Sequence, residues 1–183
     1  MRIISGSHKG RRIFAPKNLP VRPTTDMAKE ALFNILNNQY YFADLKILDL
    51  FSGTGNIAFE FASRGAKEIT CVDSHQGCVQ FISKTSEELD LGILAMRNDV
   101  FTYLGRTKDQ FDLIFADPPY DMSLEDFEKI SNLVFQNNLL KKEGSLIIEH
   151  SKQMDLSHLS GFKEQRKYGG SVFSFFSITG NGD

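Results

Sequence analysis

The chain has 183 residues, of which 41% are hydrophobic, and its formal net charge at pH 7 is −2. A chain of this length can bury a sizeable core, so we expect one domain over residues 1–183. No apolar run approaches the ~20 residues of a membrane span, and the first residues lack the long apolar core of a secretory signal. The composition therefore excludes a membrane-spanning protein and favours a soluble, intracellular one.

Cysteine and histidine residues are few in this chain. The cysteines Cys71 and Cys78 form neither a C-x-x-C motif nor a disulfide framework, and the histidines are scattered along the chain. We therefore predict neither a metal site nor a disulfide.

The first part of the chain is uniformly basic. Arg2, Lys9, Arg11 and Arg12 all precede the first acidic residue, Asp26. Residues 2–5 and 11–15, separated by a turn rich in glycine and serine, predict a short hairpin, and prolines keep residues 16–23 extended. A basic arm on an acidic body indicates that these four basic side chains contact a nucleic acid. A solvated hairpin with incidental charge remains the alternative.

Residues 24–183 predict a helix followed by an α/β core. Thr24 and Thr25 can cap the helix, and residues 27–36 place apolar side chains at 3.6-residue spacing, which indicates core packing. From residue 44 onward strands alternate with helices, as in doubly wound α/β folds. The predicted strands are residues 47–50, 68–73, 93–97, 111–116, 144–149, 162–167 and 172–178, and the predicted helices are residues 57–62, 75–89 and 124–135. The short link between the last two strands requires antiparallel pairing.

A glycine loop follows the first strand of this core. Gly53 and Gly55 permit a sharp turn and let the backbone approach a ligand at the carboxyl end of the strand. Dinucleotides and S-adenosylmethionine are both bound by such loops. Asp49 favours S-adenosylmethionine, because a carboxylate near the loop would repel a pyrophosphate and attract a sulfonium and an ammonium. An ordinary strand-turn-helix with an acidic cap remains possible from this stretch alone.

Two further acidic residues follow strands. Asp73 ends the strand 68–73, about where a ribose-binding acid lies in such folds, although it could simply cap the next helix. Residues 98–100 follow the third strand and could bracket an adenine, with Asp99 accepting a hydrogen bond from its amine. Capping of a helix by Asp99 is an equal alternative.

The sequence Asp117-Pro118-Pro119-Tyr120 leaves the strand 111–116. Successive prolines have no N–H and hold a rigid bend, so the Asp117 carboxylate and the Pro118 carbonyl can accept both hydrogen bonds of an aromatic amine. That contact favours an available lone pair on nitrogen, which can attack a sulfonium methyl while Asp117 stabilises the developing charge. Tyr120 can stack on the unpaired base. A rigid strand exit without chemistry is the alternative.

The residues 49–55 and 117–120 resemble those of class I S-adenosylmethionine-dependent amino-methyltransferases. Together with residues 2–6, 22–26, 30–34 and 63–66, they resemble the bacterial RsmD-type family, which methylates the 2-amino group of a guanine in 16S ribosomal RNA. The resemblance covers nearly the whole chain. It implies a seven-stranded, Rossmann-like sheet, a cytoplasmic monomer, and a partly assembled small ribosomal subunit as substrate.

The resemblance also implies residue roles. Asp117, Pro118, Pro119 and Tyr120 would hold the guanine. The S-adenosyl-L-methionine site would be formed by Arg22, Thr24, Asp49, Phe51, Ser52, Gly53, Gly55, Asp73, Ser74, Asp99 and Val100. An adenine or DNA amino-methyltransferase is the nearest rival, but it would need a target-recognition domain for which this chain has little room. A catalytically idle RNA-binding module and an NAD oxidoreductase are further alternatives, which the acidic residues disfavour.

Overall fold

The computed structural model describes residues 1–20 and 24–178. The strands are β1 (Lys46–Leu50), β2 (Glu68–Asp73), β3 (Leu94–Arg97), β4 (Phe111–Ala116), β5 (Leu140–Ser151), β6 (Phe162–Tyr168) and β7 (Ser171–Ser177). The helices are α1 (Asp26–Asn37), α2 (Asn56–Ser63), α3 (Gln76–Glu88), α4 (Val100–Arg106) and α5 (Leu124–Gln136), with a 3-10 helix at Phe42–Asp44. None of these helices is long and apolar enough to cross a lipid bilayer.

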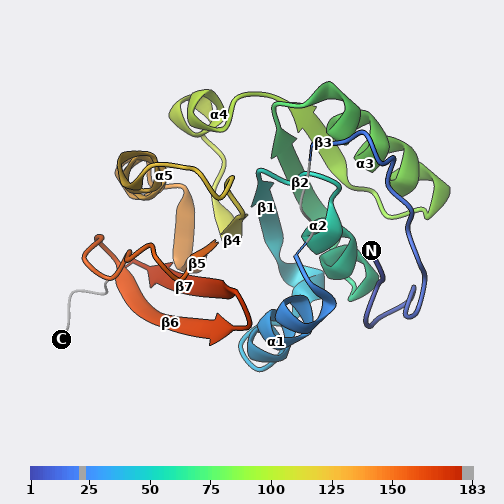
Figure 1. The fold of residues 1–183 in the computed structure, drawn as a ribbon, viewed down its shortest axis with the longest axis horizontal. Coiled ribbons are helices and arrows are strands. Elements are labelled where there is room, and N and C mark those ends of the chain that lie inside the picture. Colours follow the sequence, from blue (N-terminus) through green and yellow to red (C-terminus); the bar gives the residue numbers. More distant parts are fainter. Residues whose placement is uncertain (21–23, 179–183) are drawn as a thin grey trace.

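All seven of these strands form one sheet in the order β3-β2-β1-β4-β5-β7-β6. The first five run parallel, whereas β7 is antiparallel to both β5 and β6. Helices cover both faces of the sheet (Figure 1), with α1, α2 and α3 on one face and α4 and α5 on the other. The predicted doubly wound fold with an antiparallel last strand is therefore confirmed.

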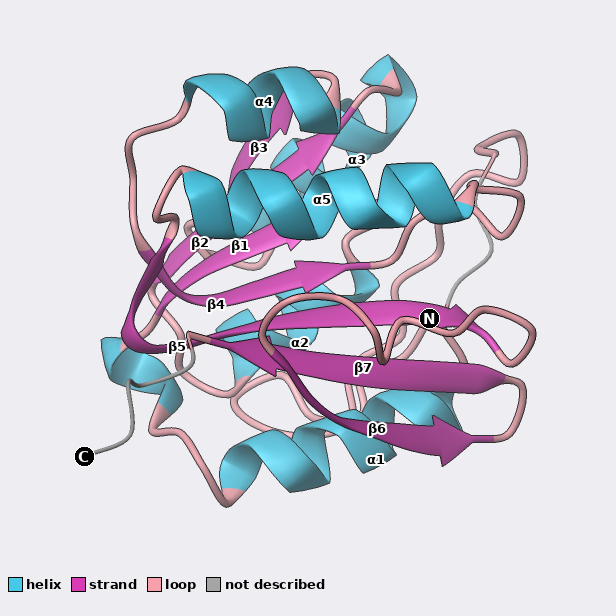
Figure 2. Cartoon of the chain, turned by 90° about the vertical axis from the view of Figure 1, so that its left-hand side faces the viewer, coloured by secondary structure: helices cyan, strands magenta, loops and turns pink. Residues whose placement is uncertain are grey.

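The two faces of the sheet carry separate apolar cores because successive side chains of a strand point to opposite sides. In β1, Ile47 packs with the core under α1, α2 and α3, and Leu48 packs with the core under α4 and α5. Figure 2 shows α4 and α5 together on one side of the sheet and α1 on the opposite side. By the same alternation, Asp49 of β1, Asp73 of β2 and Glu149 of β5 lie on the side of α1, α2 and α3, because Ile47, Cys71 and Ile147, two positions earlier in each strand, pack there.

Most observed bounds differ slightly from the sequence-based ones, and the largest difference is at the start of β5. β5 begins at Leu140 rather than at residue 144, and β3 begins at Leu94 rather than at residue 93. Neither α4 nor the 3-10 helix was predicted, because both are too short to show a clear apolar period. For residues 98–100, where α4 begins, the sequence leaves adenine binding and helix capping as equal alternatives, and Asp99 is the N-cap of α4.

The predicted hairpin of the basic arm forms with little strand pairing. Arg2 and Arg12 make an isolated antiparallel bridge. Beyond it the first limb turns toward α2, because the N–H groups of Ile4 and Ser5 donate to the Glu60 carboxylate over 2.8 and 3.0 Å. The arm is thus held to α2 by the buried Glu60 carboxylate and by Ser63, whose hydroxyl donates to the Ser5 carbonyl over 2.6 Å.

Candidate active site

A cavity of about 530 Å³ opens where β1 and β4 lie side by side. The chain order reverses at this point, since β2 and β3 extend the sheet on one side and β5 on the other. Doubly wound sheets bind ligands at such a switch point, outside the carboxyl ends of the strands, and the volume suits a small molecule. The lining residues include Pro20, Thr24, Asp49, Phe51, Ser52, Gly53, Thr54, Asn56, Asp73, Ser74, His75, Cys78, Asp117, Pro118, Pro119 and Tyr120.

The loop between β1 and α2 contains three left-handed residues. Phe51, Gly53 and Gly55 have φ angles of 55°, 53° and 78°. Glycine adopts this conformation without steric cost, whereas Phe51, on the cavity wall, is strained in it. A Cβ atom at Gly55 would come within 3.0 Å of the side chains of Ile82 and Phe59, so the packing of α2 against α3 also requires glycine there.

Asp49 is only 2% exposed, yet it lines the cavity. Its Oδ2 atom has no hydrogen-bond partner among the described residues, and neither has the hydroxyl of Ser52, also on the wall. Burial, and after it the nearby Asp73 carboxylate, raise the pKa of Asp49 to about 8. Buried polar atoms without partners are rare in native structures. These two atoms are therefore available to a ligand that brings a cation or a donor.

Asp73, at the end of β2, joins two loops of the cavity. Its Oδ2 accepts a hydrogen bond from the N–H of Gly53 over 2.8 Å, and its Oδ1 accepts one from the N–H of His75 over 2.8 Å. A carboxylate oxygen can accept more than one hydrogen bond. The two backbone contacts therefore fix the orientation of the carboxylate and leave acceptor capacity on both oxygens.

Asp117 lines the cavity directly after β4. The hydroxyl of Thr24 lies 3.1 Å from Oε2 of Glu149 and 3.4 Å from Oδ2 of Asp117. It has one hydrogen and can donate to only one of them at a time. Burial, and after it the Glu149 carboxylate, raise the pKa of Asp117 well above its ordinary value. Asp117 therefore holds its proton more tightly than an exposed carboxylic acid does.

A smaller cavity of about 110 Å³ adjoins the first and shares three wall residues with it, Thr24, Asp117 and Tyr120. Its remaining wall includes Glu149 and Gly170. Tyr120 is 51% exposed at the rim. Asp117 thus borders two spaces, one that it shares with Asp49 and one that it shares with Glu149.

The structure brings most of the predicted site residues into one place. Asp49, Phe51, Ser52, Gly53, Asp73, Ser74, Thr24 and the segment 117–120 all line the larger cavity. Asp99 and Val100 are not on its wall: Asp99 caps α4, where its Oδ1 accepts a hydrogen bond from the N–H of Thr102 over 2.8 Å. Gly55 is also absent from the lining, and Arg22 lies outside the described residues. The predicted RNA-binding residues lie on the separate basic arm.

A family model described as "Conserved hypothetical protein 95" matches residues 1–177. The ribosomal RNA small subunit methyltransferase D of Escherichia coli K12 is 31% identical to this chain, with 81% of this chain and 74% of the relative aligned. The chain belongs to the RsmD-type methyltransferase family. YlbH of Bacillus subtilis is 33% identical, with 88% of each chain aligned.

Solved structures share the fold of this RsmD-type chain. That of yhhF from Escherichia coli superposes with a TM-score of 0.84 at 24% identity, over 96% of both chains. A 16S rRNA N2 methyltransferase of T. thermophilus, in complex with AdoMet and guanosine, superposes with a TM-score of 0.70 at 20% identity. The alignment covers 86% of this chain and 44% of that one. At these identities the likeness concerns the fold alone.

Two buried ionisable residues were missed from the sequence: Glu149, on the wall of the smaller cavity, and Lys29, which contacts the wall residue Asn56 of the larger one. Glu149 is 3% exposed and accepts a hydrogen bond from the hydroxyl of Ser171 over 2.7 Å as well as the one from Thr24. An acidic residue near the end of an apolar parallel strand, as in β1, could have indicated it. Lys29 lies among the buried positions of α1. A lysine within an apolar stripe could have indicated a buried polar network.

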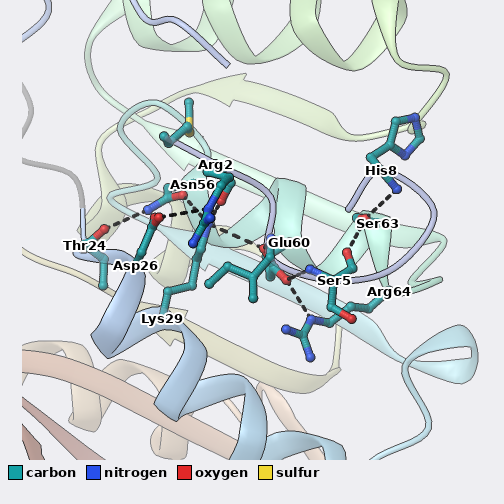
Figure 3. A network of polar contacts seen from close by, with 12 residues as sticks. Arg2, Ser5, His8, Thr24, Asp26, Lys29, Asn56, Glu60, Ser63 and Arg64 are labelled. Carbon is teal, nitrogen blue, oxygen red and sulfur yellow. Dashed lines mark hydrogen bonds and ion pairs between the residues drawn. The ribbon is translucent and has the colours of Figure 1, made fainter. Parts of the chain in front are cut away.

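Lys29 is at the centre of a buried polar network (Figure 3). Its ammonium group donates to the Arg2 carbonyl over 2.6 Å and to Oδ1 of Asn56 over 2.8 Å, and lies 3.5 Å from Oε2 of Glu60. The Asn56 amide in turn donates to the Thr24 carbonyl over 3.0 Å. The network therefore links the basic arm, α1 and α2 to the cavity wall. In this RsmD-type chain the arm and the site are parts of one polar framework.

Proposed function

We propose that this chain transfers a methyl group from S-adenosyl-L-methionine to the exocyclic 2-amino group of a guanine in 16S ribosomal RNA, within a partly assembled small subunit. The relative named as a small-subunit methyltransferase supports the choice of RNA. The solved neighbour that holds AdoMet and guanosine indicates that this fold accommodates such a cofactor and such a base. The residues of the cavity support the chemistry.

The cavity fits the cofactor by the charge and hydrogen-bonding capacity of its wall. The unpartnered Oδ2 of Asp49 suits the ammonium or the sulfonium of S-adenosyl-L-methionine. The Asp73 oxygens keep acceptor capacity for the ribose hydroxyls, since each accepts one backbone hydrogen bond. A dinucleotide would instead bring an anionic pyrophosphate to a wall that carries three acidic side chains, Asp49, Asp73 and Asp117.

S-adenosyl-L-methionine supplies an electrophilic methyl group when it is bound. Asp117 and the Pro118 carbonyl accept the two hydrogen bonds of the guanine amine and orient its nitrogen. As positive charge develops on that nitrogen, the Asp117 carboxylate stabilises it and takes the leaving proton. Its raised pKa makes it a competent proton acceptor. Tyr120, half exposed at the rim, stacks on the base that has left its helix.

The observation that carries this proposal is the meeting of Asp49, Asp73 and Asp117 on one cavity wall. The proposal is tested by comparing methyl groups on 16S ribosomal RNA from cells with and without the protein. One 2-methylguanosine should disappear when the protein is absent. Loss of a methyladenosine instead would support the rival amino-methyltransferase, and an unchanged pattern would refute the proposal.

The affinity for S-adenosyl-L-methionine should depend on pH through Asp49. Below its pKa of about 8 the carboxyl group is protonated in the free protein. It must lose that proton to attract a cation, so affinity should rise by up to about tenfold per pH unit and level off above the pKa. Calorimetric titrations with S-adenosyl-L-methionine, at pH values below and above this pKa, check the prediction.

Two variants control for other titrating groups. Asp49→Asn should bind S-adenosyl-L-methionine more weakly and lose the increase in affinity with pH that is due to Asp49. Ser52→Ala should keep that increase. Equal pH dependence in the wild-type protein and in the asparagine variant would contradict the assignment.

The basic arm should supply part of the electrostatic affinity for RNA. Neutralising both Arg11 and Arg12 to glutamine should weaken RNA binding and reduce the slope of log K against log salt by up to about two units, because each phosphate contact contributes slightly less than one. Affinity for the cofactor should not change. Filter binding at several salt concentrations measures the slope.

A matched control neutralises the exposed Arg106 and Lys152, which lie away from the arm. This pair should leave the slope closer to that of the wild type. If both double variants reduce the salt slope equally, the arm has no special role, and the lower net positive charge of the protein accounts for the effect.

A further inference from the structure

A groove of about 600 Å³ lies between the basic arm and α3, next to the candidate active site but with no lining residue in common with it. Figure 1 shows the arm, in dark blue, passing alongside α3. The arm contributes Arg11, Arg12 and Phe14 to the groove, and α3 contributes Gln80, Phe81 and Lys84. The groove therefore combines aromatic rings with positively charged side chains.

Phe14 is 81% exposed, the most exposed of the large hydrophobic residues that the structure describes. Its neighbour Ile13 is 7% exposed and packs into the core. Since adjacent side chains of an extended segment point in opposite directions, anchoring Ile13 directs Phe14 outward. Phe14 thus offers an aromatic face at the edge of the groove.

The guanidinium groups of Arg11 and Arg12 form no ion pair with any described residue, and both residues are exposed. Arg2, on the same arm, differs because it pairs with Asp26 at 3.2 Å. Glu88 also lines the groove, but its carboxylate lies 3.9 Å from the Lys84 ammonium. The local charge is therefore positive and available to an anionic partner.

We propose that this groove binds a single-stranded segment of the RNA substrate, with an unpaired base stacked on Phe14 and the adjoining phosphates at Arg11 and Arg12. The inference rests on the proposed function for its choice of RNA. Stacking on an aromatic side chain needs a base whose face is open, which a continuous duplex does not offer. The combination of a basic groove with an aromatic ring is the one by which proteins bind single strands without reading their sequence.

The groove adjoins the cavity at a defined end. Leu19 and Gly77 line the groove, whereas the next residues along the chain, Pro20 and Cys78, line the cavity. The groove meets the end of the cavity that contains Asp73. The target amine would lie at the opposite end of the cavity, near Asp117. The groove therefore holds a nucleotide that is distinct from the methylated one, and it forms a second footprint on the substrate.

The test measures binding by fluorescence anisotropy, with a labelled, unstructured single-stranded oligoribonucleotide and with a duplex of the same length. Phe14→Ala should weaken single-strand binding by about 5- to 150-fold, the range that corresponds to loss of one stacked base. Binding of the duplex and the slope of log K against log salt should stay unchanged, and Phe14→Tyr should restore affinity because it restores the ring. Affinity for S-adenosyl-L-methionine should be the same in all variants.

Tyr41→Ala is the matched control, since Tyr41 is 75% exposed but lies outside the groove. Wild-type affinity in Phe14→Ala, equal losses for single strand and duplex, or an equal loss in Tyr41→Ala would each overturn the groove assignment. Methyl transfer to small-subunit RNA by the wild-type protein is measured in parallel. Its absence would refute the proposed function, whereas its presence together with unaffected binding by Phe14→Ala would refute only the groove.

Discussion

Asp117→Asn is expected to lower the rate of methyl transfer by roughly 10- to 1000-fold, the scale of losing one preorganised electrostatic contact. Asparagine keeps the shape of the side chain and one acceptor oxygen, but it removes the charge and the ability to take a proton. The variant should fold and bind cofactor as the wild type does. Single-turnover transfer of a labelled methyl group to a small-subunit substrate measures the rate, and thermal melting controls for folding.

The pH dependence gives this experiment a second readout. Only the ionised Asp117 can accept a proton, and burial beside Glu149 raises its pKa well above the ordinary value. The wild-type rate should therefore rise with pH as Asp117 loses its proton, and the asparagine variant should lack that rise. Full activity in the variant would make the charge incidental. A rate that falls only in proportion to the folded fraction would make Asp117 a structural residue.

Lys29→Met is expected to reduce the free energy of unfolding by about 3 to 5 kcal/mol, the usual cost of removing one partner from a buried ion pair. Lys29 is 1% exposed, and methionine keeps most of its length. The change would leave the Arg2 carbonyl and Oδ1 of Asn56 without their donor and Glu60 without the nearby ammonium. Urea unfolding followed by circular dichroism measures the loss.

Lys84→Met provides the matched control because the Lys84–Glu88 pair has a separation of 3.9 Å and side chains that are 78% and 59% exposed. Exposed pairs contribute less than about 1 kcal/mol, so this variant should be close to the wild type. Equal stabilities for the two methionine variants would mean that the buried network contributes no more than a surface contact.

The buried network around Lys29 connects the basic arm to the wall of the cavity. Glu60 accepts hydrogen bonds from the backbone of the arm, and Asn56, the first residue of α2, lines the cavity. Both are connected through Lys29 (Figure 3). A substitution at Lys29 should therefore disturb the arm and the glycine loop together.

The position of the site could be predicted because its acidic residues follow parallel strands. Asp49, Asp73 and Asp117 lie at or directly after the carboxyl ends of β1, β2 and β4, and such ends meet at one edge of a doubly wound sheet. The strand order could not be derived from alternation alone. The resemblance to a known family implied a seven-stranded, Rossmann-like sheet, which the structure confirms, but the order of its strands comes from the structure alone.

Other features depend on tertiary contacts that a local pattern does not contain. Asp99 could cap a helix or face a ligand, and its capping role is recognisable only from α4, which is too short to show a clear apolar period. The predicted hairpin of the arm forms through backbone hydrogen bonds of Met1 and Ile3 to the second limb, but the N–H groups of Ile4 and Ser5 donate to the Glu60 carboxylate instead, which no local pattern indicates. The pairing of Thr24 with Glu149 joins residues that are far apart in the chain, and no spacing rule connects them.

The proposed reaction is methylation of the 2-amino group of a guanine in 16S ribosomal RNA. The most direct test incubates the purified protein with labelled S-adenosyl-L-methionine and partly assembled small subunits, digests the RNA to nucleosides and identifies the labelled product. The label is expected to elute as 2-methylguanosine from 16S RNA, and Asp117→Asn should greatly slow its appearance. Label in a methylated adenosine, or only in large-subunit RNA, would contradict the proposed reaction.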